Sequence, residues 1–197
     1  MMPLKPRMFL KKLSSVLSVK TDTMPLKPGP RHLKSKTLYI VRHGKALQDY
    51  WYIHDYDRPL IEKGIVNSVA TAKQLFAKYP APDLIISSHA ARALHTAHIF
   101  AQVTGYPHDR VQVNERLYLD GERETPKILG CLTDEIESVM MVGHNPDVTY
   151  LANTYAKQSI DVIPTSGVVT IRFETNRWSE ISKVNSDLLG ILKPDKI

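Results

Sequence analysis

Short apolar runs recur along the chain from residue 37 onwards and alternate with stretches whose apolar residues repeat at helical spacing. A run of three to six β-branched or aromatic residues is typical of a buried strand, and a repeat at every third or fourth position is typical of an amphipathic helix. The runs predict strands at 37–41, 83–87, 111–113, 138–142 and 168–173, with 178–184 as a hairpin partner of the last. The helical spacing predicts helices at 62–79, 90–104, 124–132 and 147–155.

This alternation of strands and helices predicts an α/β fold. We expect a three-layer sandwich, with a mostly parallel central sheet covered by helices on both faces. In such folds ligands bind beyond the carboxyl ends of the strands. No apolar run reaches 18 residues, so we expect neither a membrane-spanning helix nor a membrane partner.

The first 36 residues differ from the rest of the chain. They contain five prolines, nine lysines or arginines and a single acidic residue, Asp22. Three explanations are open: a disordered basic extension, a targeting peptide, or an upstream start with initiation at Met24 or later. The preference for lysine over arginine favours the disordered extension. We therefore expect an extension at 1–36 and one domain at 37–197.

The net charge of +6 belongs to that extension, because residues 37–197 carry 17 basic and 19 acidic residues. We therefore expect no nucleic-acid partner for the domain. Nucleic-acid binding through the extension remains a rival, which predicts salt-sensitive binding that is lost when 1–36 are removed. Cys131 is the single cysteine and has no internal disulfide partner, which fits a reducing compartment. We expect a cytoplasmic protein, with organellar import through 1–36 left open and the oligomeric state unknown.

Charged and nucleophilic residues follow three of the predicted strands. Arg42 and His43 follow the first, Arg92 opens the helix after the second, and His144 follows the strand at 138–142. Parallel strands bring these ends to one edge of the sheet. Guanidinium groups bind phosphate oxygens bidentately, and a neutral imidazole is a competent nucleophile toward phosphorus. The set therefore predicts a pocket for a phosphoryl group.

Five segments together carry a resemblance to a known family. They are LYIVRHGKA at 38–46, DRPL at 57–60 followed by Gly64, SSHAARALHTA at 87–97, MMVGHNPDV at 140–148 and PTSGVVTIRF at 164–173. This ordered set resembles the histidine phosphatase superfamily and, within it, the SixA-like phosphohistidine phosphatase branch. The resemblance covers about residues 37 to 194 and implies a phosphoglycerate mutase-like fold.

The resemblance also implies roles for the residues at the strand ends. His43 is the residue that becomes phosphorylated, Arg42 and Arg92 bind the phosphoryl oxygens, and His144 completes the pocket. The implied enzyme is a phosphohydrolase that needs no metal and no cofactor. Water then hydrolyses the phosphohistidine intermediate.

Two further residues are candidates, and two carboxylates are ambiguous. Glu115 lies in a stretch similar to the one where mutase-like relatives place an acidic proton donor, so it is a candidate general acid. His89 stands where many relatives have proline, and it either approaches the phosphate or shifts the loop. Asp55 and Asp57 either line the entrance or stabilise a turn, and the turn is favoured.

The spacing of the motifs bears on the substrate. Only 22 residues separate Arg92 from Glu115, which leaves little room for a lid. This favours an open pocket that accepts phosphohistidine on a protein. A phosphatase of a small phosphorylated metabolite, or a mutase, is the first alternative. A phosphate-binding module without turnover is the second, although the intact set of two arginines and two histidines argues against it.

Overall fold

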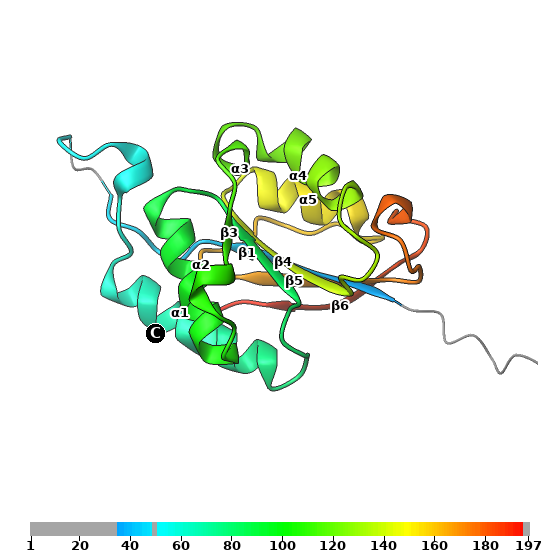
Figure 1. Ribbon diagram of the computed structural model, residues 1–197. Coiled ribbons are helices and arrows are strands. Elements are labelled where there is room, and N and C mark those ends of the chain that lie inside the picture. Colours follow the sequence, from blue (N-terminus) through cyan, green and yellow to red (C-terminus); the bar gives the residue numbers. More distant parts are fainter. Residues whose placement is uncertain (1–34, 49–50, 195–197) are drawn as a thin grey trace, which may run out of the picture. The chain divides into compact units, whose positions relative to one another are not determined.

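The computed structural model describes residues 35–48 and 51–194, which form a six-stranded sheet with helices packed on it (Figure 1). The strands are β1 (Lys36–Arg42), β2 (Leu84–Ser87), β3 (Gln112–Val113), β4 (Ser138–Gly143), β5 (Val168–Phe173) and β6 (Ser186–Leu192). The α-helices of these residues are α1 (Glu62–Phe76), α2 (Ala91–Thr104), α3 (Arg116–Leu119), α4 (Gly121–Gly130) and α5 (Asp147–Tyr155). Three 3-10 turns occupy Asp55–Asp57, His108–Arg110 and Trp178–Glu180.

The sheet is mostly parallel. Its strand order is β3-β2-β4-β1-β5-β6, in which the first four strands run parallel, β5 runs antiparallel to β1, and β6 runs antiparallel to β5. Helices α1 and α2 cover one face, and α3, α4 and α5 cover the other (Figure 1). The predicted fold class is confirmed.

Strand β1 shows why the apolar runs are nearly continuous. Leu38 and Ile40 belong to the apolar cluster under α5, whereas Tyr39 and Val41 belong to the cluster under α1 and α2. All four side chains are fully buried. Successive side chains of a strand point to opposite faces, so a strand covered on both faces needs apolar residues at every position.

The predicted hairpin at the end of the chain is wrong in its second strand. The partner of β5 is β6, and the 3-10 turn at Trp178–Glu180 precedes it. Trp178 is only 1% exposed, and its indole N–H donates to the carbonyl oxygen of Ile136 at 2.7 Å. The tryptophan therefore anchors the connection to the core, and the chain pairs only after this anchor.

All four predicted helices are present, but the start of one differs and a fifth, short helix is added. Helix α2 ends at Gly105 as expected, with a left-handed φ of 71°. Helix α4 begins three residues before the predicted start, and the short helix α3 was not predicted. A Cβ on Gly121, where α4 starts, would lie 2.6 Å from a carboxylate oxygen of Asp147. This close approach to α5 is a tertiary contact with no local sequence signal.

The expected extension falls almost wholly outside the described residues. Residues 1–34 are not described, so the extension, its predicted disorder and its possible targeting role stay predictions. Lys36, the last residue assigned to the extension, is instead a fully buried member of β1. Its ammonium group donates to the carbonyl oxygens of Asp134 at 2.7 Å and Ile136 at 2.8 Å. The domain therefore starts before the predicted boundary.

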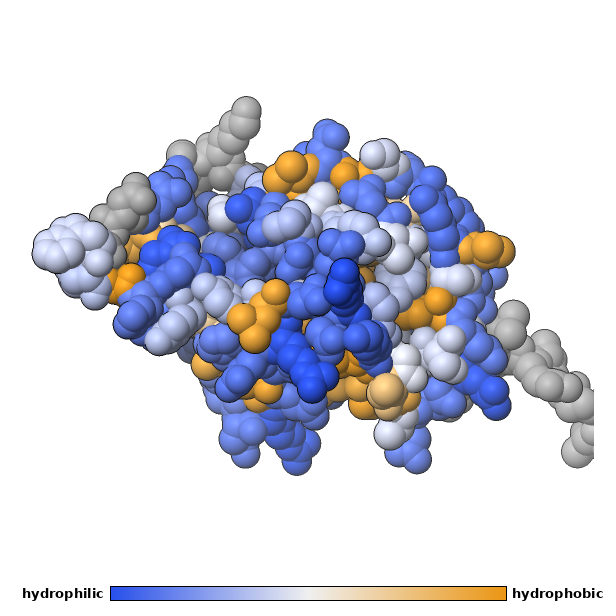
Figure 2. Space-filling model, turned by 90° about the horizontal axis from the view of Figure 1, so that it is seen from above, coloured by the Kyte–Doolittle hydropathy of each residue, from blue (hydrophilic) through white to orange (hydrophobic). Residues whose placement is uncertain are grey.

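One face of the molecule shows hydrophobic side chains as separate spots among hydrophilic ones (Figure 2). This face lies toward the top of Figure 1. In the part of the chain that the structure describes, each helix is too short or too polar to cross a membrane.

Candidate active site

Four functional side chains meet where the parallel strands end. Arg42 is paired with Gly143 across β1 and β4, and the neighbouring β2 ends at the same edge. Arg42, His43, Arg92 and His144 line one pocket of about 260 Å³ at this edge. We call these four residues the strand-end cluster. The expectation that the sheet brings them together is confirmed.

His43 is held by the backbone as it leaves β1. Its N–H donates to the carbonyl oxygen of Gly143 at 3.0 Å. Its ring Nδ1 lies 2.7 Å from the carbonyl oxygen of Gly44, and a carbonyl only accepts, so Nδ1 carries the hydrogen. The other ring nitrogen, Nε2, is then the unprotonated one.

The surroundings of His43 keep its imidazole neutral. Burial lowers the pKa of His43 to about 4. The hydrogen bond to Gly44 acts in the opposite direction, and the charges of Arg92, Arg42 and Arg58 add to the lowering. At neutral pH, Nε2 therefore keeps the lone pair that a nucleophile needs.

A glycine follows His43 because α1 approaches the backbone there. A Cβ on Gly44 would lie 2.7 Å from Ser68 Oγ and 2.9 Å from the carbonyl oxygen of Gly64. The amide N–H of Gly44 donates to Thr96 Oγ1 of α2 at 2.9 Å. Gly44, the residue after His43, is thus held by α1 and α2 together.

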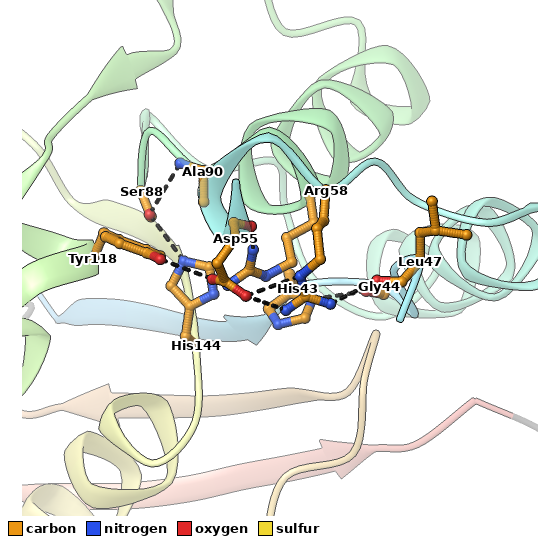
Figure 3. A network of polar contacts seen from close by, with 10 residues as sticks. His43, Gly44, Leu47, Asp55, Arg58, Ser88, Ala90, Tyr118 and His144 are labelled. Atoms are coloured by element: carbon orange, nitrogen blue, oxygen red, sulfur yellow. Dashed lines mark hydrogen bonds and ion pairs between the residues drawn. The ribbon is translucent and has the colours of Figure 1, made fainter. Parts of the chain in front are cut away.

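His144 faces His43, with 5.0 Å between ring centroids. Its Nε2 lies 2.9 Å from Ser88 Oγ, which also accepts the N–H of Ala90 at 3.3 Å (Figure 3). We assign the Ser88 hydroxyl as the donor to Nε2, which places the hydrogen of the His144 ring on Nδ1, the nitrogen without a partner among the described residues. Burial lowers the pKa of His144 to about 3, with His43 and Arg92 adding to the effect, so this ring is neutral too.

The cluster carries buried polar atoms that the protein itself does not satisfy. Arg42 Nε, Arg92 Nε and His144 Nδ1 are buried, and none has a hydrogen-bond partner among the described residues. A buried donor without a partner costs about 1–3 kcal/mol. The three residues that carry these atoms, Arg42, Arg92 and His144, line the pocket that holds His43.

Asp55 is the carboxylate that contacts the arginines of this pocket. Arg92 donates to its carbonyl oxygen at 2.5 Å and to Oδ2 at 2.9 Å. Arg58 donates twice to Oδ1, at 2.8 and 2.6 Å, and the Tyr118 hydroxyl donates to Oδ2 at 2.7 Å. In Figure 3 the carboxylate lies between Tyr118 and His144 on one side and His43 and Arg58 on the other.

Asp55 has the favoured role, because it stabilises a turn through Arg58. It does not line the pocket, but it binds Arg58 and Arg92, which do. The carboxylate of Asp57 is exposed and makes no hydrogen bond or ion pair within the described residues, while its backbone N–H donates to the carbonyl oxygen of His54 at 2.9 Å. Burial would raise the pKa of Asp55, but the hydrogen bonds from Tyr118, Arg58 and Arg92 hold it well below its usual range. The carboxylate is therefore ionised. We call residues 51–58 the Asp55 segment.

Comparison with known proteins agrees with this geometry. Residues 38–138 match the model of the histidine phosphatase superfamily (branch 1), which is just over half of the chain. An uncharacterized chloroplastic protein of Arabidopsis thaliana is 28% identical over 173 residues, which is 82% of this chain and 79% of its own length. The chain belongs to the histidine phosphatase superfamily.

Two solved structures share the fold of this superfamily member. A structure assigned to phosphohistidine phosphatase SixA from Agrobacterium tumefaciens is 26% identical, with a TM-score of 0.62, and the match covers 81% of this chain and 99% of that one. The protein histidine phosphatase SixA complexed with tungstate is 23% identical, with a TM-score of 0.67 and coverage of 80% and 97%. The expected phosphoglycerate mutase-like fold is thereby confirmed, since a phosphoglycerate mutase from Bacillus anthracis also aligns, with a TM-score of 0.52.

Glu115, the candidate general acid, does not join the strand-end cluster. It is exposed at the start of α3, and its carboxylate makes no hydrogen bond or ion pair within the described residues. It is also absent from the lining of the pocket around His43. Its role in catalysis stays a prediction.

His89 approaches the pocket only through another ring. Its centroid lies 5.1 Å from Tyr118 and 5.9 Å from Tyr56, while Tyr118 lies 5.5 Å from His144. His89 is half-buried and does not line the pocket. Its predicted contact with substrate would have to come from the side occupied by Tyr118.

Sequence reasoning missed three residues of the site. Arg58 lines the pocket, Tyr118 binds Asp55, and Ser88 orients His144. Arg58 and Ser88 stood within the quoted motifs, which was a usable signal. Tyr118 gave none, because its contact with Asp55 spans 63 positions of the chain.

Proposed function

We propose that this member of the histidine phosphatase superfamily is a metal-independent phosphohydrolase in which His43 Nε2 accepts the phosphoryl group. The observation that carries the proposal is the set of three unpartnered donors, Arg42 Nε, Arg92 Nε and His144 Nδ1, around a neutral His43. Donors placed in advance where charge develops are a large source of catalysis.

The reaction has two steps. The lone pair of His43 Nε2 forms a bond to phosphorus while the bond to the leaving atom breaks, and the leaving atom keeps that electron pair. When the leaving atom is a nitrogen of an imidazole that carries hydrogen on its other nitrogen, the product is a neutral imidazole and no proton is added. A water oxygen then attacks phosphorus, the bond to Nε2 breaks, and the proton of water passes to solvent. Arg42, Arg92 and His144 donate hydrogen bonds to the phosphoryl oxygens in both steps.

The substrate we propose is phosphohistidine on a protein. An imidazole leaving group can already carry its proton, so the reaction needs no acid in contact with the pocket. This suits a site in which Glu115 is exposed and unengaged. For phosphate esters, whose leaving oxygen needs a proton, Glu115 remains the proposed donor.

Exposed apolar side chains in the segments that supply Asp55, Arg58 and Tyr118 support a protein substrate. Trp51 is 95% exposed and Tyr52 63% exposed, and both belong to the Asp55 segment. Leu119, next to Tyr118, is 76% exposed. Aromatic residues are enriched in protein interfaces, where they supply much of the binding energy. The two structural relatives are described as SixA, a phosphohistidine phosphatase, which favours the same substrate.

Trapping the intermediate tests the proposal. The protein is mixed with a ³²P-phosphohistidine protein, quenched in alkali and digested, and we expect acid-labile label on the peptide that contains His43. His43→Ala should carry no label and lose at least about 10³-fold in kcat/KM. His95→Ala, an exposed histidine of α2, is the matched control and should label normally. Near-normal turnover by His43→Ala would overturn the assignment, and phosphate binding without labelling would favour a binding module.

The cytoplasmic location expected from the sequence also stays a proposal. The Arabidopsis relative is described as chloroplastic, which supports organellar import as the alternative. Fusing residues 1–36 to a fluorescent protein separates the two: diffuse fluorescence supports the cytoplasm, and organellar fluorescence supports a targeting peptide.

A further inference from the structure

The arginines of the pocket differ in which of their donors are already used. Arg58 donates from Nε and Nη2 to Asp55 and from Nη1 to the carbonyl oxygen of Leu47, the last at 2.6 Å. Arg92 donates from both terminal nitrogens to Asp55, and its buried Nε has no partner among the described residues. Asp55 therefore accepts four of the five hydrogen bonds that these two arginines donate to protein oxygens.

Asp55 is an anion held as a bound anion would be. Its carboxylate accepts two hydrogen bonds on each oxygen, from Arg58 on one and from Arg92 and Tyr118 on the other. Guanidinium groups bind carboxylates and phosphates with the same fork of donors. A substrate with a second acidic group next to its phosphoryl group would need these same donors.

We propose that Asp55 is a specificity-determining residue: it occupies a second anion site beside the phosphoryl pocket and restricts the enzyme to substrates with a single anionic group at the reacting end. The inference rests on the proposed function, because it takes the strand-end cluster as the phosphoryl site. It disfavours phosphorylated acids and bisphosphates, and it favours a phosphoryl group on a neutral or cationic leaving group.

The alternative is a purely structural role for Asp55, in which its ion pairs only hold the Asp55 segment in place. The two roles predict different changes. Loss of a structural anchor weakens every ligand alike. Loss of an occupying anion frees the donors of Arg58 and Arg92, and binding improves selectively for ligands that carry a second acidic group.

Two matched probes separate these outcomes. Glycerol 3-phosphate and 3-phosphoglycerate differ in that a hydroxymethyl group of the first is a carboxylate in the second. Their dissociation constants are measured by titration calorimetry at pH 7 on the full chain, with His43→Asn present throughout so that no phosphoryl transfer occurs. The variants compared on this background are Asp55→Asn, Asp55→Glu and Asp57→Asn.

We expect Asp55→Asn to shift the ratio of the two dissociation constants at least about tenfold toward 3-phosphoglycerate, as one charge-assisted hydrogen bond would. Asp55→Glu should restore the original preference. Asp57→Asn removes the same charge from the same turn and should leave the ratio unchanged. An unchanged ratio in Asp55→Asn, or an equal shift in Asp57→Asn, would overturn the inference alone. Failure of both probes to bind the chain with Asp55 intact would overturn the phosphoryl site as well.

Discussion

The strand-end cluster and the Asp55 segment border the same pocket but satisfy their polar groups in opposite ways. In the cluster, three buried donors from Arg42, Arg92 and His144 have no partner among the described residues. In the Asp55 segment, the polar atoms of Asp55 and Arg58 are paired with protein atoms, and Asp55 is half-exposed. The cluster thus leaves buried polar atoms without a partner among the described residues, whereas the carboxylate of Asp55 is already hydrogen-bonded on both oxygens.

The two regions are also held by different forces. His43 is fixed by a backbone hydrogen bond to β4 and by the packing of Gly44 against α1. The Asp55 segment is held by ion pairs near solvent, each of which contributes about 0–1 kcal/mol. The proposed chemistry therefore rests on residues held by the sheet, and the proposed choice of substrate rests on a surface turn.

Arginine substitutions in the two regions test this difference most directly. Arg42→Ala removes a donor aimed at the phosphoryl group and should lower kcat/KM by about 10³-fold, as does loss of a positioned donor in other enzymes. Arg58→Ala removes a guanidinium that is already occupied and should cost about tenfold or less. Steady-state kinetics with one phosphohistidine protein, after both variants are shown to melt like the parent, gives the two numbers. Equal losses of kcat/KM in the two variants would contradict the difference drawn between the strand-end cluster and the Asp55 segment.

The two regions also differed in how far the sequence predicted them. The strand-end cluster followed from the apolar runs, because parallel strands must bring their carboxyl ends to one edge. The helices followed from the helical spacing of their apolar residues. The contacts of Asp55 did not follow, since the partners Arg92 and Tyr118 lie 37 and 63 positions away and the turn that aims the carboxylate has no periodic pattern. Trp178 shows the same limit, because its burial in the apolar core and its hydrogen bond to Ile136 are tertiary contacts without a local sequence pattern.

The free energy of unfolding should depend on pH in two separate ranges, one set by the histidines of the strand-end cluster and the other by Asp55. His43 and His144 have folded pKa values of about 4 and 3, whereas an unfolded histidine titrates near 6.5. As pH falls from about 6.5 to 4, the unfolded chain gains protons that the folded chain refuses, so each ring lowers the free energy of unfolding by about 1 kcal/mol per pH unit. Asp55 has a lowered pKa, so its contribution is present above its unfolded value near 4 and is lost only below it.

Urea unfolding at a series of pH values measures these ranges. His144→Gln should flatten the slope between pH 6.5 and 4, and Asp55→Asn should leave that slope intact. If Asp55→Asn flattened this slope and His144→Gln did not, the acid sensitivity would belong to the Asp55 segment, which would contradict the prediction.

The smallest expected effect concerns Ser88, which connects the cluster to the start of α2. Its hydroxyl bonds His144 Nε2 at 2.9 Å, and without it the ring can place its hydrogen on either nitrogen. Ser88→Ala should therefore lower kcat/KM by about tenfold, the equivalent of one neutral hydrogen bond. The NMR shifts of the His144 ring nitrogens supply the readout that a packing defect would not move: the parent should show hydrogen on Nδ1 and the variant a mixture. A parent ring with hydrogen on Nε2 would contradict the assigned tautomer, and would mean that His144 presents a lone pair rather than a donor to the phosphoryl group.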